Sequence, residues 1–376
     1  MNKIDELFEI LLNEGGSDLH LKERRPPKIR KSGAIAPIRE ELLTREEMLE
    51  LLQPLPRPAV WKQFMETGDA DFAYDMENRD DARFRANYYR HIDGIGAVFR
   101  MVPSQIKTLD ELGIPKVVKT FGDLESGLVL VTGPTGSGKS TTLAAILDYI
   151  NTTYSKHVIT IEDPIEFVYK NKKSVFTQRE IPHHSPNFFT ALKDAVRSDS
   201  NVVMVSDLRD LETMSMTLTA ANMGLLVFGT LHTNNASKTI DRIIDIFPSE
   251  RQAQTRTMLA HCLRGVCAQL LLKRHDGRGR IAVNEILIAN QAVEAIIREG
   301  ANARLVDIMM TGKQMGMQLM DDAIADLFER GVVNGQEAYM KAIDKERFAN
   351  YFDMQKEFPA PKNNNNKPSP PAPKPS

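Results

Sequence analysis

The spacing of apolar residues predicts an amphipathic helix near the start of the chain. Its apolar face is marked at the i, i+3, i+4 and i+7 positions by Ile4, Leu7, Phe8, Leu11 and Leu12. Gly15-Gly16 ends this pattern, as glycine commonly does after a helix. The chain therefore opens with one helix that packs against a core through a single face.

Alternation of apolar and polar residues predicts strands after this helix. From Ala82 to Tyr88 the apolar residues Phe84, Ala86 and Tyr88 alternate with Arg83, Arg85 and Asn87. A turn at Asp93-Gly94 leads into a second strand at Ala97–Val102, and Ser32-Gly33 indicates a hairpin within Lys28–Ile38. Residues 1–102 thus resemble a separate α+β domain, followed by a linker at residues 103–115.

From residue 116 onward, strand-like apolar runs alternate with helical patterns. The runs are Leu128–Val131, Val158–Ile161, Val202–Val205 and Leu225–Thr230. Such alternation is typical of a mostly parallel sheet with helices on its faces, so we predict an α/β domain at residues 116–350. Residues 250–350 are expected to be helices that pack onto it. Residues 351–376 are rich in proline and asparagine and are expected to be disordered.

Composition and charge narrow the classes of protein. The 376 residues are 42% hydrophobic and 26% charged, with a formal net charge of −2. This balance offers no basic track for nucleic acid, and no apolar run is long enough to suggest a transmembrane segment. The N-terminus lacks the pattern of a signal peptide, so we expect a cytoplasmic protein. Cys262 and Cys267 fall in a stretch with helical patterning and are interpreted as buried core thiols.

The strongest chemical signal follows the first apolar run of the second domain. It matches GxxxxGK[ST] in full: Gly133, Pro134, Thr135, Gly136, Ser137, Gly138, Lys139 and Ser140. Glycines allow successive backbone N–H groups to face one anion, and the following helix adds its positive N-terminal end. Lys139 can reach the β- and γ-phosphates, and the Ser140 hydroxyl can bind Mg²⁺. The strand before and the helix after argue against a chance Gly/Ser turn, so the chain is predicted to bind a nucleoside triphosphate.

Around this loop the sequence resembles the type IV pilus retraction ATPases. The resemblance is carried by Leu128–Thr142, by Ile161–Phe167 as an aspartate box and by Phe228–Thr233 as a histidine box. Shorter matches extend it from residue 4 to about 330: Gly16–His20, Arg83–Arg85, Ala97–Arg100, Lys238–Asp245 and Gly316–Gln318. The family implies an N-terminal PAS-like domain, a RecA-like P-loop ATPase domain with C-terminal helices, and a hexameric ring with ATP and Mg²⁺ between subunits.

The resemblance also implies roles for individual residues. Thr141 joins the P-loop residues in binding nucleotide, Glu162 and Glu166 lie near Mg²⁺ and the attacking water, and His232 senses the γ-phosphate. The N-terminal arginines that face the neighbouring subunit's nucleotide correspond to Arg83, Arg85 and Arg100. The implied function is disassembly of a pilus at the inner membrane, in contact with a membrane platform protein. The ring is a homo-hexamer or contains a paralogue.

The sequence departs from the family pattern in three places. Asp207 stands where a catalytic Glu is expected, which shortens the side chain by one methylene. Misplacement by about 1 Å can cost on the order of 100-fold in rate, although Asp207 can still hold Mg²⁺ through water. Leu225 replaces a histidine, and Glu294-Ala295 replace Arg-Asn. These departures favour an accessory paralogue with slow hydrolysis, and neutral drift is the alternative.

Other functions remain open at the level of sequence. A regulatory subunit that binds nucleotide without hydrolysing it would explain Asp207 and Leu225. Pilus-extension and type II secretion ATPases share the ATPase domain, but they carry a four-cysteine zinc module that two cysteines cannot supply. A nucleic-acid motor is disfavoured by the balanced charge.

Overall fold

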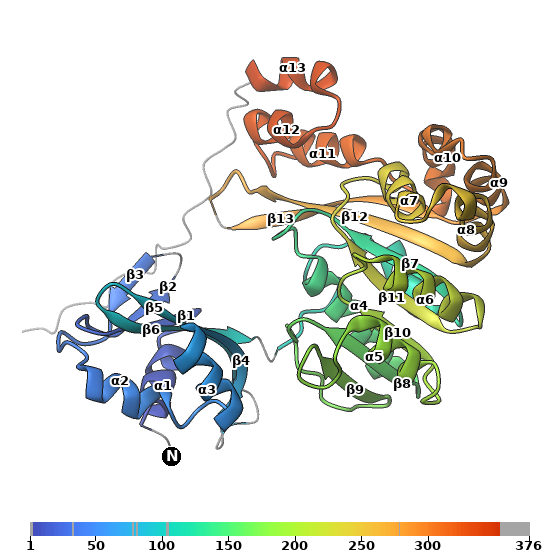
Figure 1. The fold of residues 1–376 in the computed structure, drawn as a ribbon. Helices are drawn as coiled ribbons and strands as arrows, with labels where there is room; N and C mark the ends of the chain where they lie inside the picture. Colours follow the sequence, from blue (N-terminus) through green and yellow to red (C-terminus); the bar gives the residue numbers. More distant parts are fainter. Residues whose placement is uncertain are drawn as a thin grey trace, which may run out of the picture. The chain divides into compact units, whose positions relative to one another are not determined.

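The computed structural model describes residues 3–31, 34–76, 79, 82–102, 105–277 and 279–353 (Figure 1). It divides the chain into two compact units. The first comprises Met1–Ile106 with Glu166–Lys170, and the second comprises Lys107–Ile165 with Asn171–Ser376. The division falls inside the proposed linker at residues 103–115. Of the proposed disordered tail at residues 351–376, residues 351–353 instead form the end of a helix, and residues 354–376 lie outside the described residues.

The first unit contains a six-stranded antiparallel sheet in the order β3-β2-β1-β6-β5-β4. Its strands are β1 Asp18–Lys22, β2 Lys28–Lys31, β3 Ala34–Pro37, β4 Asp69–Asp75, β5 Arg83–His91 and β6 Gly94–Val102. Its helices are α1 Asp5–Asn13, α2 Arg45–Leu52 and α3 Pro58–Thr67. The predicted first helix and the β5–β6 hairpin are confirmed. β2 and β3 also pair as expected, although the turn at Ser32-Gly33 lies outside the described residues.

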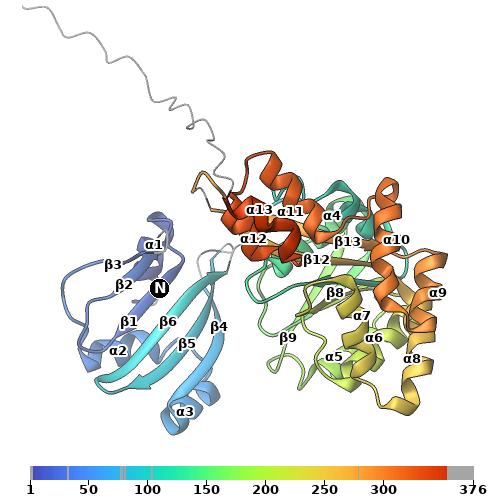
Figure 2. The ribbon, with the colours of Figure 1, turned by 90° about the horizontal axis from the view of Figure 1, so that it is seen from above.

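The core of this unit lies between one face of the sheet and its helices (Figure 2). Phe8 of α1 stacks on Phe84 of β5 at 4.0 Å between ring centroids, and Tyr88 contacts Phe64 of α3 and Phe99 of β6 edge to face. Because side chains alternate along a strand, the β5 residues that alternate with Phe84 and Tyr88 point to the opposite face. That face carries Arg83 and Arg85, as the alternation predicts.

The second unit contains a seven-stranded sheet in the order β13-β12-β7-β11-β10-β8-β9. Its strands are β7 Gly127–Thr132, β8 His157–Glu162, β9 Val175–Glu180, β10 Val202–Val205, β11 Leu226–Leu231, β12 Leu263–Lys273 and β13 Arg280–Ile288. Strands β12, β7, β11, β10, β8 and β9 run parallel, and β13 is antiparallel to β12 at the edge. All four predicted strands are present, and the fold class is confirmed.

Helices cover both faces of this sheet (Figure 2). One face packs against α5 Phe188–Ala195, α6 Leu211–Asn222, α7 Ala236–Asp245, α8 Ser249–Cys262, α9 Gln291–Glu299 and α10 Leu305–Thr311. The P-loop helix α4 Lys139–Thr153 packs on β7 and on the 3-10 segment η1 Lys116–Asp123. The C-terminal helices α11 Met320–Glu329, α12 Gly335–Lys341 and α13 Lys345–Asp353 form a smaller core with β12 and β13. Short 3-10 segments occur at η2 Asn302–Arg304 and η3 Gly312–Met315.

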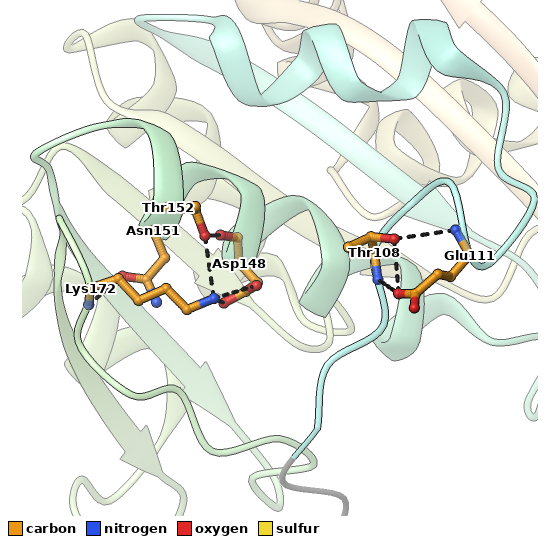
Figure 3. A network of polar contacts seen from close by, with 6 residues as sticks. All are labelled: Thr108, Glu111, Asp148, Asn151, Thr152 and Lys172. Carbon is orange, nitrogen blue, oxygen red and sulfur yellow. Dashed lines mark hydrogen bonds and ion pairs between the residues drawn. The ribbon is translucent and has the colours of Figure 1, made fainter.

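The C-terminal half of α4 is fixed by the loop before β9 (Figure 3). Lys172 reaches Asp148 with its ammonium group at 2.7 Å and donates its backbone N–H to the Asn151 side chain at 3.0 Å. Figure 3 also shows a turn near the start of this unit, formed by Thr108 and Glu111. The side chain of each residue accepts a hydrogen bond from the backbone N–H of the other. The contacts of Lys172 hold the C-terminal end of α4, whose other end starts in the P-loop.

The expectation of helices alone across residues 250–350 is wrong. Helix α8 ends at Cys262, and the apolar run from Leu263 becomes β12, which pairs with β7 and β13. A strand buried on both faces is apolar almost throughout, so its spacing does not distinguish it from a buried helix. Cys267 therefore lies on a strand rather than on the helical stripe with Cys262. Both thiols are free and buried, as predicted.

Among the described residues, no helix combines the length and the apolar character that crossing a membrane requires.

Candidate functional site

The candidate site lies at the carboxyl edge of the parallel sheet. The P-loop follows β7, His232 follows β11, Asp207 follows β10 and Glu162 ends β8. Because these four strands are neighbours in that order, and parallel strands about 4.8 Å apart end at the same edge, their four segments are brought side by side. Residues separated by almost 100 positions in the sequence therefore meet at one place.

The P-loop adopts the backbone conformation that anion binding requires. Gly133, Gly136 and Gly138 have φ values of 145°, 77° and 87°. Residues that carry a Cβ atom rarely adopt such positive φ values. A Cβ atom at Gly136 would meet no other atom within 4 Å, so this part of the loop faces open space. Left-handed glycines between ordinary residues turn successive N–H groups toward one point, as in an anion-binding nest.

Lys139 begins α4 and is largely buried. Its ammonium group donates to the carbonyl oxygens of Gly133 at 2.8 Å and Pro134 at 3.2 Å. These bonds hold the cation against the loop itself, where a phosphate group can exchange for the carbonyl oxygens. Ser140 and Thr141 follow on the first turn of α4, at its positive N-terminal end.

A buried amide network supports the loop from β12. Gln269 donates from Nε2 to the Ser137 carbonyl oxygen at 2.8 Å, and its Oε1 accepts from Thr142 at 2.8 Å and from Asn284 at 3.0 Å. Sequence reasoning missed Gln269 and Asn284. The available signal was a glutamine inside the apolar run Leu263–Leu272, since a polar side chain that is buried there needs defined partners.

Asp207 and His232, two of the proposed site residues, lie close together. Asp207 Oδ2 lies 3.5 Å from His232 Nε2 and 2.5 Å from Arg209 Nε. Asp207 Oδ1 is buried and has no hydrogen-bond partner among the described residues. A buried carboxylate oxygen without a partner is costly, so this atom is suited to a water molecule or a hydrated cation. Arg209 was not identified from the sequence.

Glu162 lies on the neighbouring strand and is buried. Its Oε1 accepts from the Thr160 hydroxyl at 2.7 Å and from Gln178 Nε2 at 3.3 Å. Part of its acceptor capacity is thus used within the sheet. Glu166 is exposed and belongs to the segment that groups with the first unit. Its role near the site stays a prediction.

The three candidate arginines share one face of the first unit's sheet. Arg85 and Arg100 are direct cross-strand partners on β5 and β6, and Arg100 in turn faces the buried Asp18 of β1. Arg100 Nε donates to Asp18 at 2.9 Å, and Arg83 Nη1 donates to Asp75 at 3.3 Å. The sheet therefore gathers Arg83, Arg85 and Arg100, and their action on a nucleotide stays a prediction.

Leu225 lies far from this edge in the chain. It precedes β11, whereas His232 follows that strand, so six strand residues separate them. At about 3.3 Å per residue the two positions are roughly 20 Å apart. The leucine at this position therefore does not alter the candidate site at the carboxyl edge of the sheet.

The residues present fit a nucleotide with Mg²⁺. The glycine cradle and Lys139 suit phosphate oxygens, and the oxygen ligands of Ser140 and Asp207 are of the kind that Mg²⁺ prefers. We assign the phosphate groups to Gly133–Ser140 on this chemistry.

Comparison with known proteins agrees with the geometry. The family described as type II/IV secretion system protein matches residues 79–340. The type IV pilus retraction ATPase PilT of Pseudomonas aeruginosa is 44% identical over 345 residues, covering 92% of this chain and 99% of PilT. The type IV pilus ATPase PilU of the same organism is 33% identical over 340 residues, with coverage of 90% and 88%.

Solved structures extend the likeness to three dimensions. The crystal structure of the pilus retraction motor PilT with bound ADP matches with a TM-score of 0.86 and 39% identity, covering 92% of this chain and 98% of that chain. The ATPase DotB of Legionella pneumophila matches with a TM-score of 0.75 and 28% identity over 90% of this chain and 94% of DotB. The chain therefore belongs to the type II/IV secretion system protein family, within its branch of type IV pilus retraction ATPases.

Proposed function

We propose that this chain hydrolyses Mg·ATP as a subunit of a hexameric ring and uses the energy to disassemble a type IV pilus. Its similarity to PilT and PilU supports the first part of this proposal, that the chain is a nucleotide-binding ATPase of a type IV pilus motor. The observation that carries the proposal is the sheet edge at which the P-loop, His232 and Asp207 converge.

At this edge each side chain has a task that its position supports. The P-loop amides and Lys139 hold the phosphates, and bound Mg²⁺ would neutralise charge on the β- and γ-oxygens. Asp207 orients and activates the attacking water, while His232, whose ring lies 3.5 Å from Asp207, contacts the γ-phosphate. Arg209 and His232 both face Oδ2 of Asp207, and the contact with Arg209 limits the directions in which the carboxylate can point.

Assembly into a ring would give a role in hydrolysis to the sheet face that carries Arg83, Arg85 and Arg100. Arg85 and Arg100 stand opposite each other on adjacent strands, an arrangement that like charges disfavour by a few tenths of a kcal/mol to about 1 kcal/mol. Asp18 offsets part of this repulsion through Arg100. A triphosphate presented by a neighbouring subunit would offset the rest, and the arginines would stabilise its transition state in trans.

Steady-state ATP hydrolysis by the purified assembly, together with its measured mass, tests the proposal. Lys139→Ala should abolish turnover, and the mass should correspond to a hexamer. A natural chain that turns over no faster than Lys139→Ala, at any pH and Mg²⁺ concentration at which it binds ATP, would exclude the motor function.

That same result would support a second candidate function, a regulatory subunit that binds nucleotide without hydrolysing it. The shorter side chain of Asp207 favours it, because the carboxylate is already engaged by Arg209 and has less reach toward water. Such a subunit would act in a mixed ring with a catalytic paralogue. We further propose that either form docks on a platform protein at the inner membrane.

A further inference from the structure

Gln269 is an unusual residue for its position. It lies in β12, between the P-loop strand β7 and the edge strand β13, and only 2% of its surface is exposed. The residues on either side, Ala268 and Leu270, pack in the core of the C-terminal helices. Burial of a carboxamide costs free energy unless its hydrogen bonds are made, so its partners indicate why it is there.

The partners of Gln269 fix the orientation of its carboxamide. The Ser137 carbonyl can only accept a hydrogen bond, so it must face Nε2. Oε1 then accepts from Thr142 Oγ1 in α4 and from Asn284 Nδ2 in β13. Three separate elements thus hold the side chain in a single rotation, with its donor aimed at the P-loop.

Holding the Ser137 carbonyl also sets the direction of the next N–H group. A trans peptide is planar, and its C=O and N–H bonds point in opposite directions. The Ser137 oxygen points into the protein toward β12, so the N–H of Gly138 points away from β12. Since Gly138 has a φ of 87° and leads directly into Lys139, this N–H belongs to the turn that faces the phosphates.

Close packing supports the same arrangement. A Cβ atom at Gly138 would lie 2.8 Å from Gln269 Nε2, and one at Gly133 would lie 2.3 Å from the Gln269 backbone oxygen. Two of the three P-loop glycines with positive φ therefore allow the loop to lie directly on this residue. The conformation of the P-loop thus depends on its contacts with β12 as well as on its own sequence.

We propose that Gln269 is a positioning residue that holds the Ser137–Gly138 peptide in the orientation needed to bind phosphate. The inference rests on the proposed function, because it assigns a supporting group to the same nucleotide site. Asn284 extends the support: its backbone carbonyl accepts from Gln318 Nε2 at 2.7 Å, and both residues line a cavity of about 620 Å³ beside α11. The P-loop is thereby linked to the C-terminal helices.

Gln269→Met tests the proposal, because methionine keeps the length and volume of the side chain but cannot donate to Ser137. Thr142→Val is the matched control: it removes another bond to Gln269 and leaves the Ser137 bond in place. The measurements are calorimetric affinities for Mg·ATP and Mg·ADP, KM and kcat, thermal unfolding, and hydrogen–deuterium exchange of the P-loop peptide.

For Gln269→Met we expect affinities for Mg·ATP and Mg·ADP to fall by the same factor, about tenfold or more, since both nucleotides use the amide cradle. KM should rise and P-loop exchange should quicken. Thr142→Val leaves the bond from Asn284 to Oε1, which still orients the carboxamide, so it should lower the unfolding midpoint but change both affinities less than about twofold. If Gln269→Met does not fold, Gln269→Asn carries the test, because its shorter side chain keeps the carboxamide but cannot span the gap.

Unchanged affinity in Gln269→Met, with the natural chain binding normally, would overturn this inference alone. Equal losses in Gln269→Met and Thr142→Val would also overturn it, since they would indicate a general effect on folding. Failure of the natural chain to bind Mg·ATP would overturn the inference and the proposed function together.

Discussion

At the scale of single residues, Asp207 is the position on which we expect the rate of hydrolysis to depend. It lies two residues after β10, with one oxygen held by Arg209 and the other buried without a partner among the described residues. The position suits an acceptor that receives a proton from water. Its reach is shorter by one methylene than that of the glutamate expected in this family. On the proposed function, we therefore expect the rate of hydrolysis to be sensitive to a displacement of about 1 Å in this carboxylate.

Asp207→Glu should raise kcat, by up to about 100-fold, because it returns the carboxylate toward the attacking water. Affinity for Mg·ATP should hardly change, since the phosphate cradle is untouched. The measurement is steady-state hydrolysis with Lys139→Ala as the background. A lower kcat in Asp207→Glu would show that the site is built around the shorter side chain.

Gly133→Ala should destabilise the chain and abolish nucleotide binding. Its Cβ would lie 2.3 Å from a backbone oxygen of β12, and the φ of 145° is one that alanine rarely adopts. Gly113→Ala is the control, because its φ is also positive but no atom lies within 4 Å of its Cβ. The control should cost about 1–2 kcal/mol and leave binding intact. Thermal unfolding and calorimetry distinguish the two, and equal behaviour would contradict the packing argument.

At the scale of elements, the polar face of the first unit's sheet concentrates charge. Across β2, β1, β6 and β5 the directly opposed residues are Arg30, Asp18, Arg100 and Arg85. His20 lies two residues beyond Asp18 on the same face. Burial lowers the pKa of His20, and the nearby Arg30, Lys22 and Arg100 lower it further against the opposing effect of Asp18. The sheet thus favours the neutral form of this histidine.

Acidification should therefore destabilise the first unit. The pKa of His20 is lower in the folded chain than its ordinary value of 6.5, so the unfolded chain binds the proton more readily. The contribution to stability is present above pH 6.5 and is lost as the pH falls through the folded pKa. His20→Asn should reduce this dependence, whereas His261→Asn, at an exposed position on α8, should not. Unfolding midpoints between pH 7.5 and 5 provide the measurement, and identical profiles for His20→Asn and the natural chain would contradict it.

At the scale of the whole molecule, the proposed ring separates two halves of one reaction between neighbouring chains. On this proposal one chain would supply the P-loop and Asp207, and the next would supply Arg85 and Arg100. This division would explain why opposed arginines are kept on the sheet face away from the helices that pack on the aromatic core. It would also make hydrolysis depend on assembly.

Mixing two inactive variants tests this division of labour. Lys139→Ala lacks the phosphate contact and Arg85→Ala lacks the arginine, so each alone should be inactive. In randomly mixed hexamers roughly a quarter of the interfaces would combine an intact P-loop with an intact Arg85. Activity should therefore return on mixing, up to about that fraction. No recovery in mixed rings of confirmed hexameric mass would argue that Arg85 acts within its own chain.

The sequence by itself determined the parts whose signals are local. The P-loop is contiguous, because its glycines, lysine and serine act through consecutive backbone groups. The first helix, the β5–β6 hairpin and the four buried strands β7, β8, β10 and β11 followed from apolar spacing and turn residues. Asp207 and His232 were proposed from the resemblance to the family, at positions that follow two of these strands.

Only the tertiary structure decided which distant segments meet. Nothing local separates β12 from a buried helix, because pairing with β7 and β13 buries both of its faces. The contacts of Gln269 with Ser137 and of Arg209 with Asp207 depend on strand order and on rotamers set by packing. Sequence patterns record which residues prefer burial. The choice of partners is made by the energy of the assembled core, in which most buried polar groups find hydrogen-bond partners.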